Sequence, residues 1–172
     1  GNPATTFHIN KIHSRNGYFW KHPVHEVLVP EENFQEIEIM TDDFVLNHYP
    51  DAHKSRGSYL PLLEMSVEED PEDDRNMHYL GREYMYYGKW QKAIETLHRH
   101  LNLSRATWKD ERCASMRFMA RCYARQGFFE EATLWYLKAL EEAPYLRESY
   151  LELAFLKYYQ KNYTESYHYA HQ

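Results

Sequence analysis

Long hydrophobic runs, cysteine and glycine are scarce in this sequence. The 172 residues include six Gly, seven Pro and two Cys. No apolar stretch reaches the roughly eighteen residues that suggest a transmembrane helix, and the first residues show neither the charged nor the apolar part of a signal peptide. We therefore expect a chain without a transmembrane segment.

The two cysteines are placed too far apart to bond to each other. Cys113 and Cys122 lie in a segment that we expect to be one helix. At about 1.5 Å of rise per residue they are roughly 13 Å apart along its axis, beyond the reach of a disulfide. Two reduced thiols are typical of a cytoplasmic protein, and we predict that location.

A basic excess is also absent. The formal net charge is −6, and residues 71–172 hold fifteen Lys and Arg against fourteen Asp and Glu. Residues 1–70 are acidic, with five basic and twelve acidic side chains. Because a nucleic-acid-binding surface needs clustered positive charge, we expect no nucleic acid among the partners.

Aromatic side chains, by contrast, are abundant. Sixteen Tyr, eight Phe and four Trp are more rings than a disordered chain or a coiled coil carries. The composition therefore predicts a folded protein whose packing depends on aromatic rings.

One pattern of small and aromatic residues recurs three times in the second half of the chain. The small residues Gly81, Ala120 and Ala154 each follow a large apolar residue, at spacings of 39 and then 34 residues. An aromatic ring follows each of them at the same distance along the chain. Small side chains allow two helices to approach closely, and the ring fills the space beside them. The pattern predicts pairs of antiparallel helices.

This pattern resembles the tetratricopeptide repeat (TPR), which has a period of 34 residues and two helices per unit. Gly88 and Gly127 fall where the first helix of a pair ends, and glycine tolerates the left-handed conformation of such an end. We expect a mainly α protein, a TPR-like α-α superhelix of about three repeats preceded by a short β-rich segment. The expected parts are a capping or linker helix within 55–73 and repeats at about 74–106, 113–146 and 147–172.

The first helix of each pair lines the inner face of such a superhelix, and here it is rich in Arg and Tyr. Arg117, Arg121 and Arg125 follow at intervals of four residues, so they lie on one side of one helix. Such a row suits carboxylates or phosphates, and we predict a groove that binds an acidic peptide or protein partner. The predicted groove residues are Arg82, Tyr86, Arg117, Arg121, Arg125, Tyr158 and Tyr159. In the alternative interpretation, the arginines pair with acids on adjacent helices.

The first 54 residues show a different pattern. Short apolar and β-branched runs at 6–11, 34–40 and 44–49 are separated by turn signals and predict three or four short strands. So short a β segment has few apolar positions for a core of its own. We therefore expect residues 1–54 to be the edge of a larger, truncated α/β catalytic domain.

The segment Lys11 to Leu28 contains an Arg, an aromatic-Trp turn and a Val-His-Glu step. It resembles the end of the catalytic domain of family 2 (GT-A type) glycosyltransferases, in which a return strand ending in His follows. Some bacterial members of that family carry TPRs directly after this segment. The resemblance implies transfer of a sugar from a nucleotide-sugar donor to a glycan or protein acceptor, with a divalent metal, Mn²⁺ or Mg²⁺, on the diphosphate.

The resemblance also suggests roles for four residues. His25 becomes a candidate for contact with the metal or the diphosphate, and Glu26 for positioning the acceptor, so both are predicted catalytic residues. Trp20 and Arg15 become candidates for substrate binding, by stacking on a sugar ring and by contact with a phosphate.

The donor site itself is missing from the sequence. No Asp-x-Asp motif follows a predicted strand, and a nucleotide-binding core needs roughly 100 to 200 residues of its own. We therefore expect these 172 residues to bind no cofactor and to be inactive alone. They would form a fragment of a transferase whose repeats bind the acceptor or a partner, or self-associate.

Two other interpretations compete with the transferase. In the first, the chain is a freestanding TPR interaction module whose N-terminal strands form a small cap. A metal-dependent hydrolase is disfavoured, because no two His lie at i, i+4 beside a Glu, and His98 and His100 face apart on a helix. In either case the unfinished third repeat exposes apolar helix surface, which favours a homo-oligomer.

Overall fold

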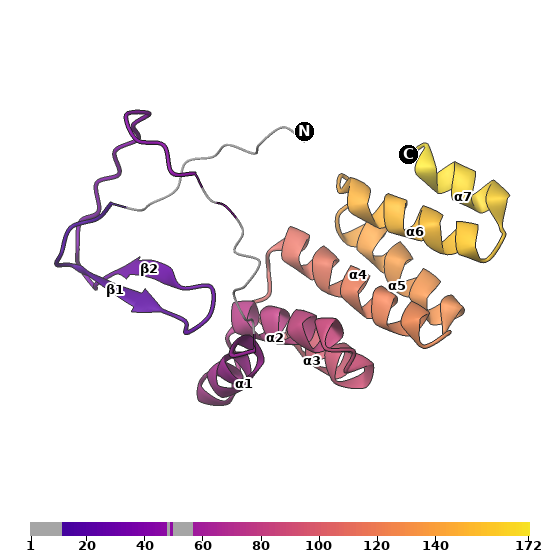
Figure 1. The fold of residues 1–172 in the computed structure, drawn as a ribbon, viewed down its shortest axis with the longest axis horizontal. Helices are drawn as coiled ribbons and strands as arrows, with labels where there is room; N and C mark the ends of the chain where they lie inside the picture. The colour runs from indigo at the N-terminus through magenta and orange to yellow at the C-terminus, as the bar shows by residue number, and fades with distance from the viewer. Residues whose placement is uncertain (1–11, 48, 50–56) are drawn as a thin grey trace. The chain divides into compact units, whose positions relative to one another are not determined.

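The computed structural model describes residues 12–47, 49 and 57–172. The chain divides into two units, residues 1–56 and 57–172. The first unit contains a two-stranded antiparallel sheet, and the second is a row of α-helices (Figure 1). This confirms the predicted fold class, a helical superhelix preceded by a short β segment.

The sheet of the first unit is a single hairpin. Strand β1 (Tyr18–Lys21) pairs with β2 (Val27–Pro30), with Trp20 opposite Leu28. Gly17, just before β1, has a φ of 86°, and a Cβ there would collide with the ring of Phe34. Glycine is therefore required where the chain of residues 31–34 turns back across the start of the hairpin.

The prediction of three or four strands is wrong for the described residues. Residues 34–40 and 44–47 form no strand, the run at 6–11 lies outside the described residues, and so does position 48. Their apolar side chains are exposed, with Ile37 at 78% and Ile39 at 84%. Alternating sequence produces a strand only where a partner offers hydrogen bonds and a face to bury, and the described part of this unit offers neither.

The second unit contains seven helices in its described residues. They are α1 (Tyr59–Glu69), α2 (Asp74–Tyr86), α3 (Trp90–Asn102), α4 (Lys109–Arg125), α5 (Phe129–Glu142), α6 (Arg147–Tyr159) and α7 (Tyr163–Ala170). Each helix contacts the next one along the chain, which gives the zigzag of antiparallel neighbours seen in Figure 1. None of these helices is long and apolar enough to cross a membrane.

The small residues lie where the paired helices touch. Gly81 of α2 faces Leu97 of α3, and a Cβ built at Gly81 would lie 2.5 Å from the Leu97 Cγ atom. Ala120 of α4 and Ala132 of α5 are both fully buried in one cluster that also holds Leu153. The predicted reason for small residues at these positions is confirmed, because the space between the helices is already filled.

The turns between paired helices follow the predicted glycine pattern. Gly88 and Gly127 have φ values of 70° and 84°, the left-handed conformation that ends a helix. In the third pair Lys161 takes this position with a φ of 62°. The third turn therefore keeps its shape without glycine, at the cost of a strained backbone.

The five-residue insertion between the first two repeats is divided between a helix and a loop. Helix α4 begins one turn earlier, relative to its small residue, than α2 or α6 does. The loop before α4, residues 103–108, is also longer than the loop before α6, residues 143–146. The extra turn of α4 places Glu111 beside α3, where an insertion confined to the loop would not have put it.

The two cysteines are free and buried, as their spacing predicted. The Cys113 thiol lies 3.3 Å from the Ser149 hydroxyl and 3.5 Å from the carbonyl oxygen of Ala139, so it joins α4 to α5 and α6. Both cysteines act as small core residues, and neither side chain is exposed.

Candidate partner-binding face

The contacts between helices show which side of the second unit is the inner one. Helix α2 contacts α4, and α4 contacts α6, so the first helices of successive pairs lie side by side. The second helices α3 and α5 do not contact each other, and neither do α5 and α7. A row of helix pairs that is packed on one side and splayed on the other is curved, with α2, α4 and α6 on the concave side.

Equivalent positions of the three repeats form rows along this inner face. One row follows the small residues directly and consists of Arg82, Arg121 and Phe155. A second row lies one turn further and consists of Tyr86, Arg125 and Tyr159. The inner face thus changes from cationic at α2 and α4 to aromatic at α6.

Two of the predicted groove arginines are engaged within the protein. Arg117 and Arg121 of α4 both donate to the carboxylate of Glu152 on α6, and the Arg121 Nε and Nη2 atoms lie 2.8 and 2.6 Å from its oxygens. The alternative interpretation, pairing with an acid on an adjacent helix, therefore describes these two side chains. Arg117 is 13% exposed, which makes it a structural residue more than a partner-binding one.

The electrostatics of this pair are dominated by the shared carboxylate. Burial alone would raise the pKa of Glu152, but the hydrogen bonds from Arg121 and Arg117 outweigh it and lower that pKa. Tyr136 of α5 adds a hydroxyl 3.2 Å from the same carboxylate. Glu152 thus holds three helices together, and sequence reasoning missed it. Its only signal was an acid standing where the other repeats carry the rings Tyr79 and Phe118.

Arg82 lies among aromatic rings on α2. Its guanidinium carbon is 4.4 Å from the centre of the Tyr79 ring and 6.0 Å from that of Tyr86. Tyr86 is 59% exposed and close enough to Arg121 to influence the pKa of that guanidinium. The stacked arginine and the exposed phenol present a cation and an aromatic surface at the same place.

The remaining groove candidates are open to solvent. Arg125 at the end of α4 is exposed and forms no hydrogen bond or ion pair with any described residue. Tyr158 and Tyr159 at the end of α6 are 57% and 79% exposed, and their rings stand edge to face at 6.2 Å. Arg125 therefore offers all its donors to a ligand, and the two tyrosines offer aromatic surface.

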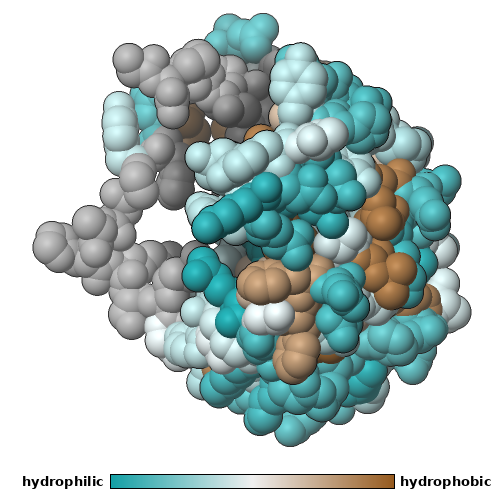
Figure 2. Space-filling model, turned by 90° about the vertical axis from the view of Figure 1, so that its right-hand side faces the viewer, coloured by the Kyte–Doolittle hydropathy of each residue, from teal (hydrophilic) through white to brown (hydrophobic). Residues whose placement is uncertain are grey.

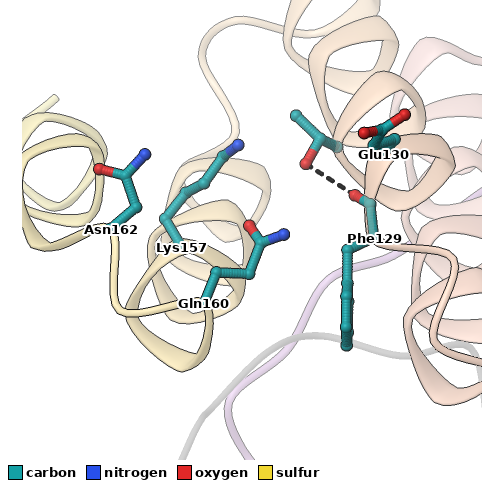
Figure 3. A pocket seen from close by; sticks show the side chains of 6 residues that line it. Phe129, Glu130, Lys157, Gln160 and Asn162 are labelled. Carbon is teal, nitrogen blue, oxygen red and sulfur yellow. Dashed lines mark hydrogen bonds between the residues drawn. The ribbon is translucent and has the colours of Figure 1, made fainter.

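A shallow hollow of about 450 Å³ lies between α5 and α6 (Figure 3). The start of α5 contributes Phe129 and Glu130, and the end of α6 contributes Lys157. Lys157 pairs with Glu165 of α7 at 2.9 Å, so its charge is already neutralised. The hollow has no cluster of reactive side chains, and we assign it no chemistry.

The transferase candidates lie in the first unit and are described by themselves. Trp20 on β1 is 59% exposed, Arg15 and Glu26 are exposed, and His25 is half buried. His25 has a φ of 58° and, with Glu26, sits in the turn that joins β1 to β2. Among the described residues His25 belongs to no group of three side chains able to hold a metal. Its predicted role stays a prediction.

Solved structures with a similar fold are found for this chain. PilF from Pseudomonas aeruginosa aligns with a TM-score of 0.56 and 15% identity over 63% of this chain and 48% of that chain. The fold is that of a TPR superhelix. MamA MSR-1 aligns with a TM-score of 0.54 and 18% identity, over 66% of this chain and 63% of that one. A kinesin light chain-type protein from Podosopora anserina with nearly identical TPR-like repeats gives 0.55 and 24%, over 67% and 64%.

These similarities establish a TPR-like fold and nothing beyond it. The chain spans between about half and two thirds of the length of these proteins. The aligned share, about two thirds of this chain, is the share that the helical unit makes up. No family model matches the sequence, and no curated protein does.

Proposed function

We propose that the TPR-like unit is a protein-interaction scaffold whose inner face binds an acidic segment of a partner protein. The observation that supports this most is Arg125, a cation without a partner among the described residues, placed between Tyr86 and Tyr159 on the same inner row. Arg82 and the outer edge of Arg121 extend the positive surface. One carboxylate, Glu152, serves both Arg117 and Arg121, so positive charge remains in excess along α4.

The chemistry of this face fits a carboxylate flanked by apolar side chains. An exposed guanidinium binds a carboxylate through two parallel hydrogen bonds, which is stronger than a contact between neutral groups. The rings of Tyr158 and Tyr159 supply flat, rigid surface for neighbouring side chains of the ligand. The part of the inner face built by α6 is less charged, which gives a bound segment a direction.

The test begins with a phage-displayed library of random peptides, selected on the whole chain. The selected peptides are then titrated by fluorescence anisotropy. We expect enrichment of Asp and Glu beside aromatic or aliphatic residues. Arg125→Glu should weaken binding at least tenfold, since a charge-assisted hydrogen bond contributes about 1.5–3 kcal/mol and reversal adds repulsion.

The matched control is Arg99→Glu. Arg99 is an exposed arginine on α3, which lies outside the inner face, so the same change in net charge occurs elsewhere on the molecule. Equal weakening by both variants would show that binding follows net charge alone. Selected peptides without acidic residues would contradict the proposed ligand.

A second proposal concerns the first unit and rests on the resemblance of residues 11–28 to family 2 glycosyltransferases. Trp20, His25 and Glu26 fall on one hairpin, with Trp20 on the strand and the His-Glu step in the turn that follows. In this proposal the hairpin is the end of a catalytic domain, and the TPR unit presents a glycan or protein acceptor or a partner to it.

Calorimetric titration of nucleotide-diphosphate sugars with Mn²⁺ tests the transferase proposal. We expect no binding to these 172 residues and binding to a longer chain that includes the donor site. His25→Ala in the longer chain should then reduce binding of the metal-diphosphate pair. Absence of binding in both chains would leave the interaction scaffold as the whole function.

A further inference from the structure

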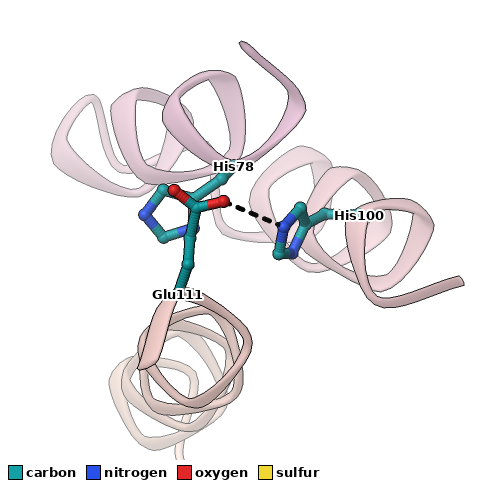
Figure 4. A group of neighbouring side chains, drawn as sticks. All are labelled: His78, His100 and Glu111. Atoms are coloured by element: carbon teal, nitrogen blue, oxygen red, sulfur yellow. Dashed lines mark ion pairs between the residues drawn. The ribbon is translucent and has the colours of Figure 1, made fainter. Parts of the chain in front are cut away.

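A buried cluster of two histidines and a glutamate lies where α2, α3 and α4 meet (Figure 4). His78 is on α2, His100 on α3 and Glu111 on the extra first turn of α4. One ring nitrogen from each histidine and one carboxylate oxygen all lie within 4.8 Å of one another. Figure 4 shows the three side chains converging from three separate helices.

Burial makes this cluster unlike an ordinary surface group of polar residues. His100 is fully buried and His78 is 5% exposed, while the Glu111 side chain is 10% exposed. Burying a carboxylate and two imidazoles is costly unless each polar atom finds a partner. A cluster of this kind therefore needs hydrogen bonds, protons or a cation to be stable.

Ser115 fixes the orientation of both rings. Its hydroxyl oxygen lies 2.7 Å from the His78 Nδ1 atom and 3.0 Å from the His100 Nδ1 atom. A hydroxyl donates one hydrogen only, so the two Nδ1 atoms cannot both be acceptors from it. At least one histidine must donate from Nδ1, which leaves the Nε2 atom of that neutral ring with a lone pair.

The Nε2 atom of His100 is the decisive one. It has no hydrogen-bond partner among the residues that the structure describes, although it is fully buried. The nearest acid, Glu111, places an oxygen 3.4 Å away. A lone pair facing a carboxylate at this distance is repulsive, so a positive species, either a proton or a metal ion, belongs between them.

We propose that His78, His100 and Glu111 bind a divalent transition metal ion, with zinc as the best match. Two histidines and one glutamate are a known ligand set for tetrahedral zinc with a fourth position for water or another ligand. Hydrogen bonds from the second ring nitrogen to a neighbouring group are the usual support for such histidines, and Ser115 is placed to provide one. A small rotation of Glu111 at the start of α4 would draw the three ligand atoms together.

The proposed ion would tie the first TPR pair to the second. Helices α2 and α3 form one pair and α4 opens the next, so one ion spans the junction that carries the five-residue insertion. His78 also lies beside Phe118 of α4, with ring centroids 5.7 Å apart, on the side of the inner face. Metal binding would therefore fix the angle between the first two repeats and the spacing of Arg82 and Arg121.

The test is titration of Zn²⁺ into the metal-free chain in competition with a chromophoric chelator. Because other histidines of the chain also bind zinc weakly, the decisive quantity is one tight equivalent that depends on the cluster. We expect Glu111→Gln, which keeps the shape of the side chain, to lower the affinity of that equivalent at least about a hundredfold. His100→Gln should do the same.

The matched control is His98→Gln. His98 is exposed on the same helix, two residues from His100, so this variant removes one histidine without touching the cluster. We expect it to retain the tight equivalent, and Co²⁺ in its place should give the strong visible absorption of a tetrahedral site. The thermal unfolding midpoint should rise with zinc in the wild type and His98→Gln, and stay unchanged in Glu111→Gln.

Two results would overturn the proposal. One is the absence of a tight, saturable equivalent in the wild-type chain. The other is equal loss of zinc in His98→Gln and Glu111→Gln, which would place the binding elsewhere. Circular dichroism of Glu111→Gln, whose helix start lies at the protein surface, shows whether the variant is folded and keeps the comparison decisive.

Discussion

At the scale of single residues, Gly81 is where the sequence pattern is most strictly enforced by space. Its added Cβ would lie 2.5 Å from Cγ and 2.6 Å from Cδ2 of Leu97, a side chain with no exposed surface. Gly127 has the opposite character, because nothing lies within 4 Å of an added Cβ while its φ is 84°. One glycine is needed for close approach of helices and the other for a backbone conformation.

Gly81→Val should destabilise the chain by about 2–3 kcal/mol, since overpacking a filled core forces helices or side chains to shift. Urea unfolding followed by circular dichroism measures the loss. Gly127→Asn serves as the control and should cost less than about 1 kcal/mol, because Asn tolerates the left-handed conformation. Equal losses in the two variants would contradict the assignment of space to one and conformation to the other.

The buried thiol of Cys122 links stability to alkaline pH. Burial raises its pKa from 9.0 to about 12, and burial likewise raises the pKa of the Tyr136 hydroxyl. Above pH 9 the unfolded chain loses the thiol proton while the native chain keeps it, so the free energy of unfolding falls as pH rises. Each such group contributes a slope of at most about 1.4 kcal/mol per pH unit.

Urea unfolding between pH 7 and pH 10 measures this slope. Cys122→Ala should be less stable at neutral pH, because it leaves a small cavity, yet it should lose less stability than the wild type above pH 9. The comparison uses the slopes alone, so the cavity does not affect it. Identical slopes would show that the Cys122 thiol is not protected in the native state.

At the scale of helices, one carboxylate couples α4, α5 and α6. Glu152→Gln removes the charge that Arg117 and Arg121 share, and it leaves two cations side by side on α4. We expect a loss of about 1–3 kcal/mol at pH 7, less than for a fully buried pair because Arg121 is 37% exposed. Glu141→Gln, an exposed acid on α5, is the control and should change stability by at most about 0.5 kcal/mol.

The same contact predicts the response to acid. Because the pKa of Glu152 is lowered in the native chain, its contribution is complete above the unfolded value of 4.5 and is lost as pH falls through the native value. Glu152→Gln should therefore lose less stability than the wild type between pH 5 and pH 3. An unchanged acid slope would contradict the proposed role of this carboxylate.

The helical elements could be predicted because their signals are local. The small residues, the glycine turns and the ring that follows each turn are repeated, and each is required by space or backbone conformation. The strands could not be predicted, because the alternation in residues 34–40 says nothing about whether a partner strand is present.

The candidate site could be predicted only in part. Helical spacing correctly placed Arg117, Arg121 and Arg125 on one helix. It could not show that Glu152, more than thirty residues away from Arg117, occupies two of them. The buried histidine cluster was hidden for the same reason, since its members come from three helices and have no shared spacing.

At the scale of the whole molecule, the last helices leave apolar surface exposed in this chain. Helix α7 has no buried residue, and Leu151 and Phe155 of α6 are 53% and 54% exposed. Figure 2, which looks onto this end of the molecule, shows hydrophobic patches between hydrophilic ones. Patches of this kind favour association with another protein surface.

We therefore predict that the chain self-associates at high concentration. Size-exclusion chromatography with light scattering should show a mass that rises with concentration, and Leu151→Ser combined with Phe155→Ser should restore the monomer mass. Leu134→Ser, which changes an exposed leucine of α5, is the control and should leave the association unchanged. A monomer mass at every concentration would contradict the prediction.

The central claim is that the inner face of the TPR unit is the binding surface for an acidic segment. Nuclear magnetic resonance of the labelled chain, titrated with a selected acidic peptide, tests it most directly. We predict that amide signals shift along α2, α4 and α6, with the largest changes near Tyr86, Arg125 and Tyr159. Shifts confined to α3 and α5, or to residues of the first unit, would contradict the claim.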